Sequence, residues 1–208
     1  MTEPAPDIVA LVDRSPVASR FGHALRQAIE TAVGELVAAL RSHHTGTADH
    51  SNRLAASCRS VGEEFGLAAD DLFELELVAI LHDIGKLAVP ATILDLERPL
   101  NTAERAVVRA HTIRGAEILA DIAGLRHLAP VVRATHEHWD GTGYPDRLAG
   151  DEIPLGARVV STVDAFDAMT NDRPYRRALG HDEARRRIAA GSGTDFDPDV
   201  VRAVLASI

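Results

Sequence analysis

Apolar residues recur at steps of three and four along most of this chain, which is the spacing of one face of an α-helix. Residues 16–41 follow the pattern, with one stripe formed by Leu25, Ile29, Ala32, Leu36 and Ala39. The stripe covers barely two heptads, so this helix is expected to pack on the body of a domain rather than to form an independent coiled coil. The Pro-rich stretch before it, MTEPAPDIVALV, is expected to be irregular.

Two more helices are predicted where apolar faces lie between capping residues and a glycine. Thr47 can cap a helix that ends at Gly66, and Asp70 or Asp71 can open the next one. The segment DLFELELVAILHDIG is so apolar that it is expected to be the central, buried helix.

The rest of the chain adds further helices. Asn101 and Glu104 resemble a capping box, which predicts a helix through His111 to about residue 119. Other predicted helices cover residues 129–139, 156–169, 181–190 and 198–208. Asp197 is expected to cap the last of them. Only residues 87–90 fit a short extended piece, so the predicted fold class is all-α.

Composition limits location and partners. Cys58 is the only cysteine among the 208 residues, which excludes an internal disulfide and predicts a cytoplasmic location. No apolar run is long enough to span a bilayer, so no membrane association is expected. The net charge of −9 argues against a nucleic-acid binder, but local cations could still hold a small anion. A GC-rich coding bias explains the shortage of lysine, yet the one lysine, Lys86, follows a His-Asp pair.

That pair, His82 and Asp83, ends the most apolar helix and is the first candidate for chemistry. Burying both groups is costly unless something pairs with them, and a divalent cation can do so. For a lone pair, a His–Asp hydrogen bond without metal would be the better explanation. However, the consecutive predicted helices carry four more residues of ligand type, His50, His111, His136 and Asp164. The whole set is better explained by a metal centre inside a helical bundle.

Several motifs then resemble the HD-GYP family, a branch of the HD-domain phosphohydrolases. They are HSNRL from His50, LHDIGK ending at Lys86, RAH ending at His111, HEHWDGTGYP over 136–145, VDAFDAMTNDRPYR over 163–176 and GTDFDPDVV over 193–201. The resemblance implies an HD-domain helical bundle over residues 46–208. Residues 1–45 would be an N-terminal extension with one additional helix.

The resemblance also implies an activity, the hydrolysis of cyclic di-GMP to pGpG and onward towards GMP, with two divalent ions of iron or manganese. The first ion would be held by His50, His82, Asp83 and Asp164. The second would share Asp83 and add His111 and His136. Asp83 and Lys86 would be the catalytic residues, and the substrate would be bound by Lys86, Tyr144, Arg173 and Arg176. A diguanylate cyclase of the GGDEF type is an expected partner of the GYP loop, and the N-terminal helix could form a homodimer.

The chain departs from the family pattern at several positions. Family members usually read HHERWDG, and this chain reads THEHWDG, so Thr135 stands where a histidine ligand is expected. A hydroxyl is a poor substitute for imidazole, which predicts a weaker second metal site. His138 could replace the missing ligand only if the helix has already ended there. Gly46 stands where a third site needs an acid, and LER at residues 96–98 replaces a KPG-like stretch.

These departures leave two alternatives open. One is a catalytically degenerate module that binds metal or cyclic di-GMP, or docks partner proteins, without turnover. Thr135 favours it, and the intact HDIGK and RPYR segments argue against it. The other is a phosphohydrolase that acts on a different nucleotide. Asp167 and Asp172 lie near Asp164 and Arg173 in the sequence, and they are expected to orient those two side chains rather than to bind metal.

Overall fold

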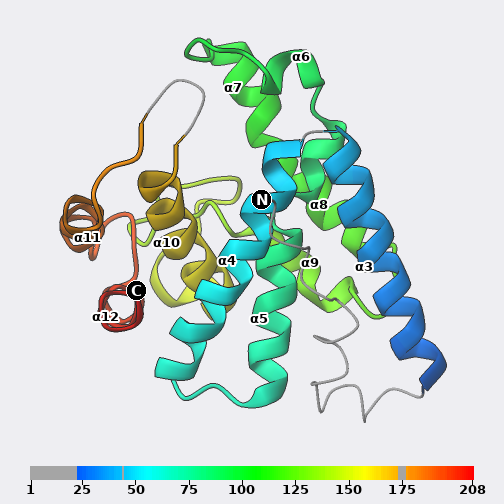
Figure 1. The fold of residues 1–208 in the computed structure, drawn as a ribbon, viewed down its shortest axis with the longest axis horizontal. Coiled ribbons are helices and arrows are strands. Elements are labelled where there is room, and N and C mark those ends of the chain that lie inside the picture. Colours follow the sequence, from blue (N-terminus) through cyan, green and yellow to red (C-terminus); the bar gives the residue numbers. More distant parts are fainter. Residues whose placement is uncertain (1–22, 44, 173–176) are drawn as a thin grey trace.

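The computed structural model describes residues 23–43, 45–172 and 177–208, and this part of the chain is built from helices (Figure 1). The longer ones are α3 (His23–His43), α4 (Thr45–Glu64), α5 (Ala69–Leu81), α7 (Thr102–Arg109), α8 (His111–Ala120), α10 (Leu155–Thr170), α11 (His181–Ala190) and α12 (Pro198–Ser207). The short ones are η1 (Ile84–Ala88), α6 (Ala91–Leu94), η2 (Arg126–Leu128), α9 (Ala129–Arg133) and η3 (Gly150–Glu152). The described residues contain no strand, only an isolated bridge between Ser192 and Phe196. The all-α prediction is confirmed.

Helix α5 lies at the centre of the bundle, as its composition predicts. Nine of its 13 residues are buried, including a continuous run from Leu75 to Leu81. It packs along α4 and also contacts α3, α9 and α10, and Figure 1 shows α4 and α5 side by side in the middle of the molecule. The burial of this helix fixes the position of the His-Asp pair that follows it.

Two predicted caps are present. Glu104 N donates to Asn101 Oδ1 at 2.9 Å, and Asn101 N donates to Glu104 Oε2 at 2.8 Å, which completes a capping box at the start of α7. At the start of α12, Asp199 N donates to Asp197 Oδ1 at 2.8 Å. The bounds of α11 also agree with the prediction.

Other predicted boundaries are wrong. Helix α4 begins at Thr45, so Thr47 lies inside its first turn and is not the cap. Residues 84–88 form the 3₁₀-helix η1, and only Val89 and Pro90 are extended, with ψ angles of 128° and 130°. The prediction of an extended piece over 87–90 was therefore half wrong.

Two predicted helices are shorter than their apolar patterns suggest. The helix expected to run from Asn101 through His111 is divided at Ala110 into α7 and α8. The helix expected over 129–139 ends at Arg133. Beyond it the chain turns, because Glu137 is buried and its Oε1 accepts hydrogen bonds from the backbone N–H groups of Asp146 and Arg147, at 2.6 and 3.1 Å. These long-range bonds hold residues 134–145 as a loop.

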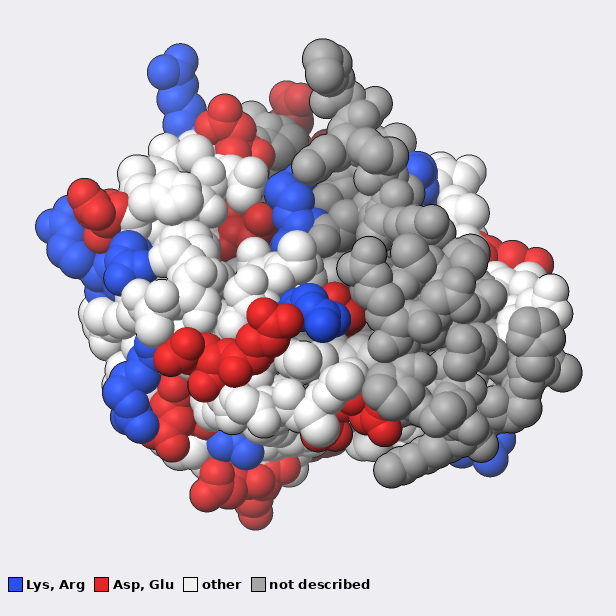
Figure 2. Space-filling view, turned by 60° about the horizontal axis from the view of Figure 1, so that its bottom comes forward, with Lys and Arg blue, Asp and Glu red and all other residues white. Residues whose placement is uncertain are grey.

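The surface carries both signs of charge. Figure 2 shows a face on which Asp and Glu side chains lie interspersed with Lys and Arg side chains, between uncharged residues. Within the described part of the chain, the helices are all too short or too polar to cross a membrane.

Candidate metal centre

Five of the six predicted ligand residues form two overlapping groups where the C-terminal end of α5 meets its neighbours, and the sixth, Asp164, lies beside His50. His82 and Asp83 follow α5, His50 lies on α4, His111 opens α8, His136 lies in the loop after α9, and Asp164 lies on α10. These segments are far apart in sequence. The packing of α4, α5, α8, α9 and α10 brings them to one place.

The first group of potential metal ligands is His50, His82 and Asp83, all three buried. One ligand atom from each lies within 4.8 Å of the others. The imidazoles of His50 and His82 meet edge to face with centroids 5.6 Å apart. Asp164 is not one of these three residues but lies beside His50, with its Oδ1 3.0 Å from His50 Nε2. Two imidazoles and two carboxylates are a donor set that suits iron, manganese or zinc.

The second group is Asp83, His111 and His136, with ligand atoms again within 4.8 Å of one another. Asp83 belongs to both groups. Its Oδ2 lies 3.4 Å from His82 Nε2, and its Oδ1 lies 3.5 Å from His111 Nε2. The two oxygens of one carboxylate therefore face different groups, which is the arrangement that a bridging carboxylate needs.

Backbone hydrogen bonds orient two of the imidazoles toward the centre. His82 Nδ1 lies 2.8 Å from Ala79 O, and His111 Nδ1 lies 2.6 Å from Val108 O. A carbonyl oxygen can only accept a hydrogen bond, so both rings carry a proton on Nδ1 and their Nε2 atoms are left for the centre. This is the support that metal-binding histidines commonly have.

Two buried nitrogens provide the test of whether a metal fits. Among the described residues, the Nε2 atoms of His111 and His136 have no hydrogen-bond partner. Leaving a buried polar atom unpaired costs roughly 1–3 kcal/mol. A cation between these nitrogens and Asp83 would satisfy both, so the donor set fits a divalent metal ion.

The charges of the centre are tightly coupled. Burial raises the pKa of Asp83, but Lys86, His82 and His111 outweigh it and hold that pKa well below the usual range. Burial, followed by the charge of His111, lowers the pKa of His136 to about 3, so this ring stays neutral as a ligand must. Burial also lowers the pKa of His50, but its hydrogen bonds to Asp164 and Asp167 outweigh it and raise that pKa to about 9.

Asp167 supports the first group, but through His50 rather than through Asp164, the ligand it was expected to orient. Its Oδ2 lies 2.6 Å from His50 Nδ1, and its Oδ1 accepts from Arg53 Nε at 3.3 Å and from Asn171 Nδ2 at 2.9 Å. This pairing occupies Nδ1 and leaves His50 Nε2 facing the centre. Asp172 accepts instead from the backbone N–H of Ala178 at 2.7 Å, so among the described residues it orients backbone rather than a ligand.

A close backbone contact fixes the distance between Asp83 and His111. A Cβ atom on Gly85 would lie 1.8 Å from the carbonyl oxygen of His111 and 2.5 Å from the backbone nitrogen of Gly115. Only glycine can therefore bring η1 against the first turn of α8. This contact places Asp83 and Lys86, on either side of Ile84 and Gly85, beside the start of α8.

The loop HEHWDGTGYP completes the second group and shields it. The ring of Tyr144 stacks on His136 with centroids 5.2 Å apart and an angle of 5° between the rings, and Tyr144 N donates to His136 O at 3.1 Å. Gly143 allows the loop to fold on itself, since a Cβ there would lie 2.3 Å from His138 N. The aromatic and glycine residues of this motif thus position one imidazole.

The two departures in this loop have defined places. The Thr135 side chain is buried, and its hydroxyl donates to Val132 O at 2.9 Å, so it supplies no ligand. His138 does not replace it although the helix has ended. Its Nδ1 lies 3.2 Å from Thr142 Oγ1 and 3.4 Å from Asp195 Oδ1, on the exposed side of the loop. The second group therefore has three protein residues.

The predicted substrate-binding residues are only partly described. Lys86 Nζ donates to Asp83 Oδ2 at 2.6 Å, and its side chain is 23% exposed, so it reaches both the centre and solvent. Tyr144 is half-buried over His136. Arg173 and Arg176 lie outside the described residues. One cation that the sequence did not single out is Arg109, whose Cζ lies 4.7 Å from the centroid of the Tyr144 ring. The available signal was its place in the RAH motif, two residues before His111.

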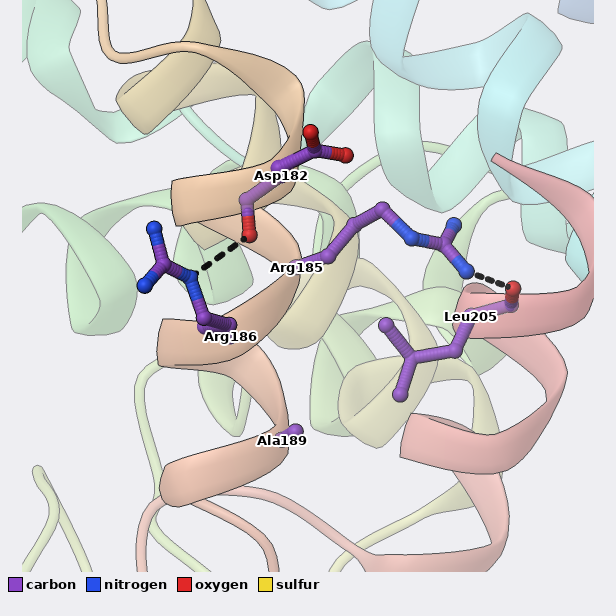
Figure 3. Close-up of a pocket in the computed structure, with 5 residues that line it drawn as sticks. All are labelled: Asp182, Arg185, Arg186, Ala189 and Leu205. Atoms are coloured by element: carbon purple, nitrogen blue, oxygen red, sulfur yellow. Dashed lines mark hydrogen bonds between the residues drawn. The ribbon is translucent and has the colours of Figure 1, made fainter.

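A hollow lies on the surface between α11 and α12, away from the metal centre (Figure 3). It is lined by Asp182, Arg185, Arg186, Ala189 and Leu205, none of which belongs to the metal centre. Arg185 donates to the carbonyl oxygens of Leu205 and Ile208, so it satisfies the C-terminal end of α12. We assign this groove a structural origin.

A helical bundle that buries two overlapping His–Asp groups around one shared aspartate defines a class of protein, the metal-binding helical domains with a central His-Asp pair. The chain belongs to the HD domain family, whose model matches residues 35–200.

Relatives within this family support the resemblance to HD-GYP proteins. The chain is 38% identical to the 3'3'-cGAMP-specific phosphodiesterase 3 of Vibrio cholerae, over 86% of this chain and 38% of that protein. It is 35% identical to the cyclic di-GMP phosphodiesterase response regulator RpfG of Xanthomonas campestris, over 83% of this chain and 46% of that protein. The chain thus spans less than half the length of these relatives.

Solved structures agree on the fold. A cyclic GMP-AMP phosphodiesterase from V. cholerae superposes with a TM-score of 0.62 at 22% identity, covering 82% of this chain and 46% of that one. A HDG"Y"P protein from Bdellovibrio bacteriovorus gives a TM-score of 0.63 at 18% identity, covering 76% of this chain and 51% of that one. The predicted HD-domain bundle is confirmed.

Proposed function

We propose that this chain is a metal-dependent phosphodiesterase that hydrolyses a cyclic dinucleotide, with cyclic di-GMP as the first substrate to test and pGpG and GMP as products. The observation that carries the proposal is the pair of buried, unpartnered Nε2 atoms of His111 and His136 beside the shared Asp83. The names of the relatives add support, since they are phosphodiesterases of cyclic di-GMP or 3'3'-cGAMP.

The metal ligands would divide into two sets. His50, His82, Asp83 and Asp164 would hold one ion, and Asp83, His111 and His136 would hold the other, with Fe(II) or Mn(II) as the candidates. When bound, such ions act as Lewis acids. They polarise a phosphodiester and lower the pKa of water to near neutrality. The protein contributes the fixed orientation of the ligands through the carbonyls of Ala79 and Val108.

Lys86 would neutralise charge on the substrate. Its ammonium has three donors, and one of them is directed to Asp83 Oδ2. The others can reach a non-bridging phosphate oxygen, where negative charge grows as the diester is attacked. Tyr144 would hold His136 in place, and Arg173 and Arg176 would contact the phosphates.

The test is hydrolysis of cyclic di-GMP by protein purified without oxygen, with Fe(II) or Mn(II) added and Asp83→Ala as the control. Metal-dependent formation of pGpG or GMP that the Asp83→Ala variant lacks would establish the activity. Binding of metal and ligand without turnover would favour the degenerate module, for which Thr135 is the argument. The GYP loop as a docking surface for GGDEF-type cyclases, the homodimer and the cytoplasmic location stay predictions.

A further inference from the structure

A column of stacked groups runs from the surface of the molecule to the metal centre. The guanidinium of Arg109 lies over the face of Tyr144, with Cζ 4.7 Å from the ring centroid. Tyr144 stacks on His136 at 5.2 Å, and His136 meets His111 edge to face at 5.0 Å. Arg109 is exposed, whereas His111 is buried. The outer end of the column is therefore a cation in contact with solvent.

This cation has no anionic partner within the described chain. Arg98, Arg114 and Arg133 each form an ion pair with a neighbouring carboxylate. Arg109 forms neither an ion pair nor a side-chain hydrogen bond with another described residue, and only the aromatic face of Tyr144 holds it. A guanidinium that stacks on an aromatic ring keeps its N–H groups free along its edge.

The chain also fixes Arg109 relative to the predicted catalytic groups. Arg109 ends α7 two residues before His111, and Lys86 lies three residues after Asp83. The contact of Gly85 with the carbonyl of His111 joins these two segments. One cation thus lies in η1 and the other two residues before the start of α8, on either side of the contact between η1 and α8.

We infer that Arg109 is a substrate-binding residue, held in place by Tyr144, that donates its guanidinium edge to a pair of acceptor atoms on the bound nucleotide. This inference rests on the proposed function. The acceptors can be two oxygens of a phosphate or the O6 and N7 atoms of guanine, since both pairs match the two parallel donors of arginine. Adenine offers N7 but presents an amino donor in place of O6.

The test compares Arg109→Gln and Arg109→Lys with the parent on cyclic di-GMP, 3'3'-cGAMP and cyclic di-AMP. The matched control is Arg105→Gln, which removes the same charge one turn earlier on α7, where the side chain is exposed and, among the described residues, donates to the carbonyl of Leu100. We expect both Arg109 variants to raise KM by about tenfold or more while kcat changes little, because a lost bidentate contact weakens binding by this amount. Lysine should rescue poorly, since it lacks the fork of donors. Arg105→Gln should keep the KM of the parent.

The substrate series distinguishes the two acceptor pairs. An equal rise of KM for all three dinucleotides identifies the phosphate, and a rise confined to those that contain guanine identifies the base edge. An unchanged KM for both Arg109 variants, or an equal rise in Arg105→Gln, would overturn the inference.

The same variants are tested on bis(4-nitrophenyl) phosphate, a simple diester without a base. If the parent cleaves this diester but no dinucleotide, the proposed substrate is wrong, and a raised KM for the Arg109 variants then still supports Arg109 as a phosphate-binding residue. An unchanged KM would refute the inference. A parent that cleaves none of these compounds with Fe(II) or Mn(II), and binds none of them, refutes both proposals.

Discussion

Replacing Gly85 by alanine tests whether the contact between η1 and α8 sets the geometry of the metal centre. The added Cβ would lie 1.8 Å from the carbonyl oxygen of His111 and 2.5 Å from the nitrogen of Gly115. Both atoms belong to the backbone, so η1 and α8 must separate. The φ angle of Gly85 is not positive, so alanine is allowed there and the cost is steric.

The expected change in the free energy of unfolding of Gly85→Ala is the difference between two opposing effects. Overpacking a core costs about 1–3 kcal/mol and sometimes more, and a contact with rigid backbone belongs at the upper end. Alanine also reduces the conformational entropy of the unfolded chain, which stabilises the folded protein by about 0.4–1 kcal/mol. The net loss in the free energy of unfolding is therefore about 2 kcal/mol, which lowers Tm by roughly 4–8 °C in a protein of this size. His111 would also move away from Asp83, so the metal content of the second group should fall.

Two other glycines on helices provide matched controls. A Cβ on Gly34 in α3 would meet nothing within 4 Å, so Gly34→Ala should raise stability by up to ~1 kcal/mol. The nearest atoms to a Cβ on Gly62 in α4 would be side-chain methyls of Leu72, Leu75 and Leu67, at 2.6, 3.0 and 3.3 Å, which can shift. Thermal unfolding and metal analysis of the three variants measure the effect. If Gly85→Ala melts like the parent and keeps its metal, the close contact does not define the site.

Three further predictions concern the centre itself. Asp83→Ala should remove both ions from the purified protein and His136→Ala only one, as metal analysis would measure; equal loss in both would contradict a shared carboxylate. Binding of Mn(II) at pH 7.5 should release about one proton, because the raised pKa of His50, about 9, keeps that ring protonated in the metal-free protein. The ring holds this proton below pH 9 and loses it as pH rises through 9. Metal affinity should therefore rise with pH up to about 9. The heat of Mn(II) binding, measured by titration calorimetry, should depend on the ionisation enthalpy of the buffer. Buffer-independent heats would show that His50 starts neutral. Thr135→Val should leave the metal content unchanged and cost about 1 kcal/mol of stability, for the lost bond to Val132 O; loss of metal would identify the hydroxyl as a ligand.

The sequence predicted the parts of the fold that depend on local pattern. The apolar run of α5, the capping box at Asn101 and the cap at Asp197 each follow from residues close in the chain. The ligand residues could also be predicted from the sequence, because histidines and aspartates that are costly to bury recur once or twice on each successive helix. Their assignment to two groups came from the family resemblance, and the structure brings the same residues together except Asp164, which lies beside His50.

The remaining features depend on contacts between distant segments. The apolar pattern of 129–139 continues past Arg133, but Glu137 binds the backbone of Asp146 and Arg147 and ends the helix early. Likewise, nothing local marks Gly85 as the residue against which α8 packs. The RAH motif pointed to the neighbourhood of Arg109 but not to its contact with Tyr144, which lies 35 positions along the chain and reaches it only through the folded loop.

Thr135 illustrates why a departure from a motif has to be judged on the geometry around it. The orientation of the ligands in the second group comes from the carbonyl of Val108 behind His111, from the stacking of Tyr144 on His136 and from Lys86 beside Asp83. None of these contacts involves Thr135, whose hydroxyl is already paired with the end of α9. The substitution therefore removes one donor from the second group and leaves its frame intact. This frame would present two imidazoles and a carboxylate to one metal ion. A coordination position would then stay open, which a catalytic site needs and a purely structural site does not.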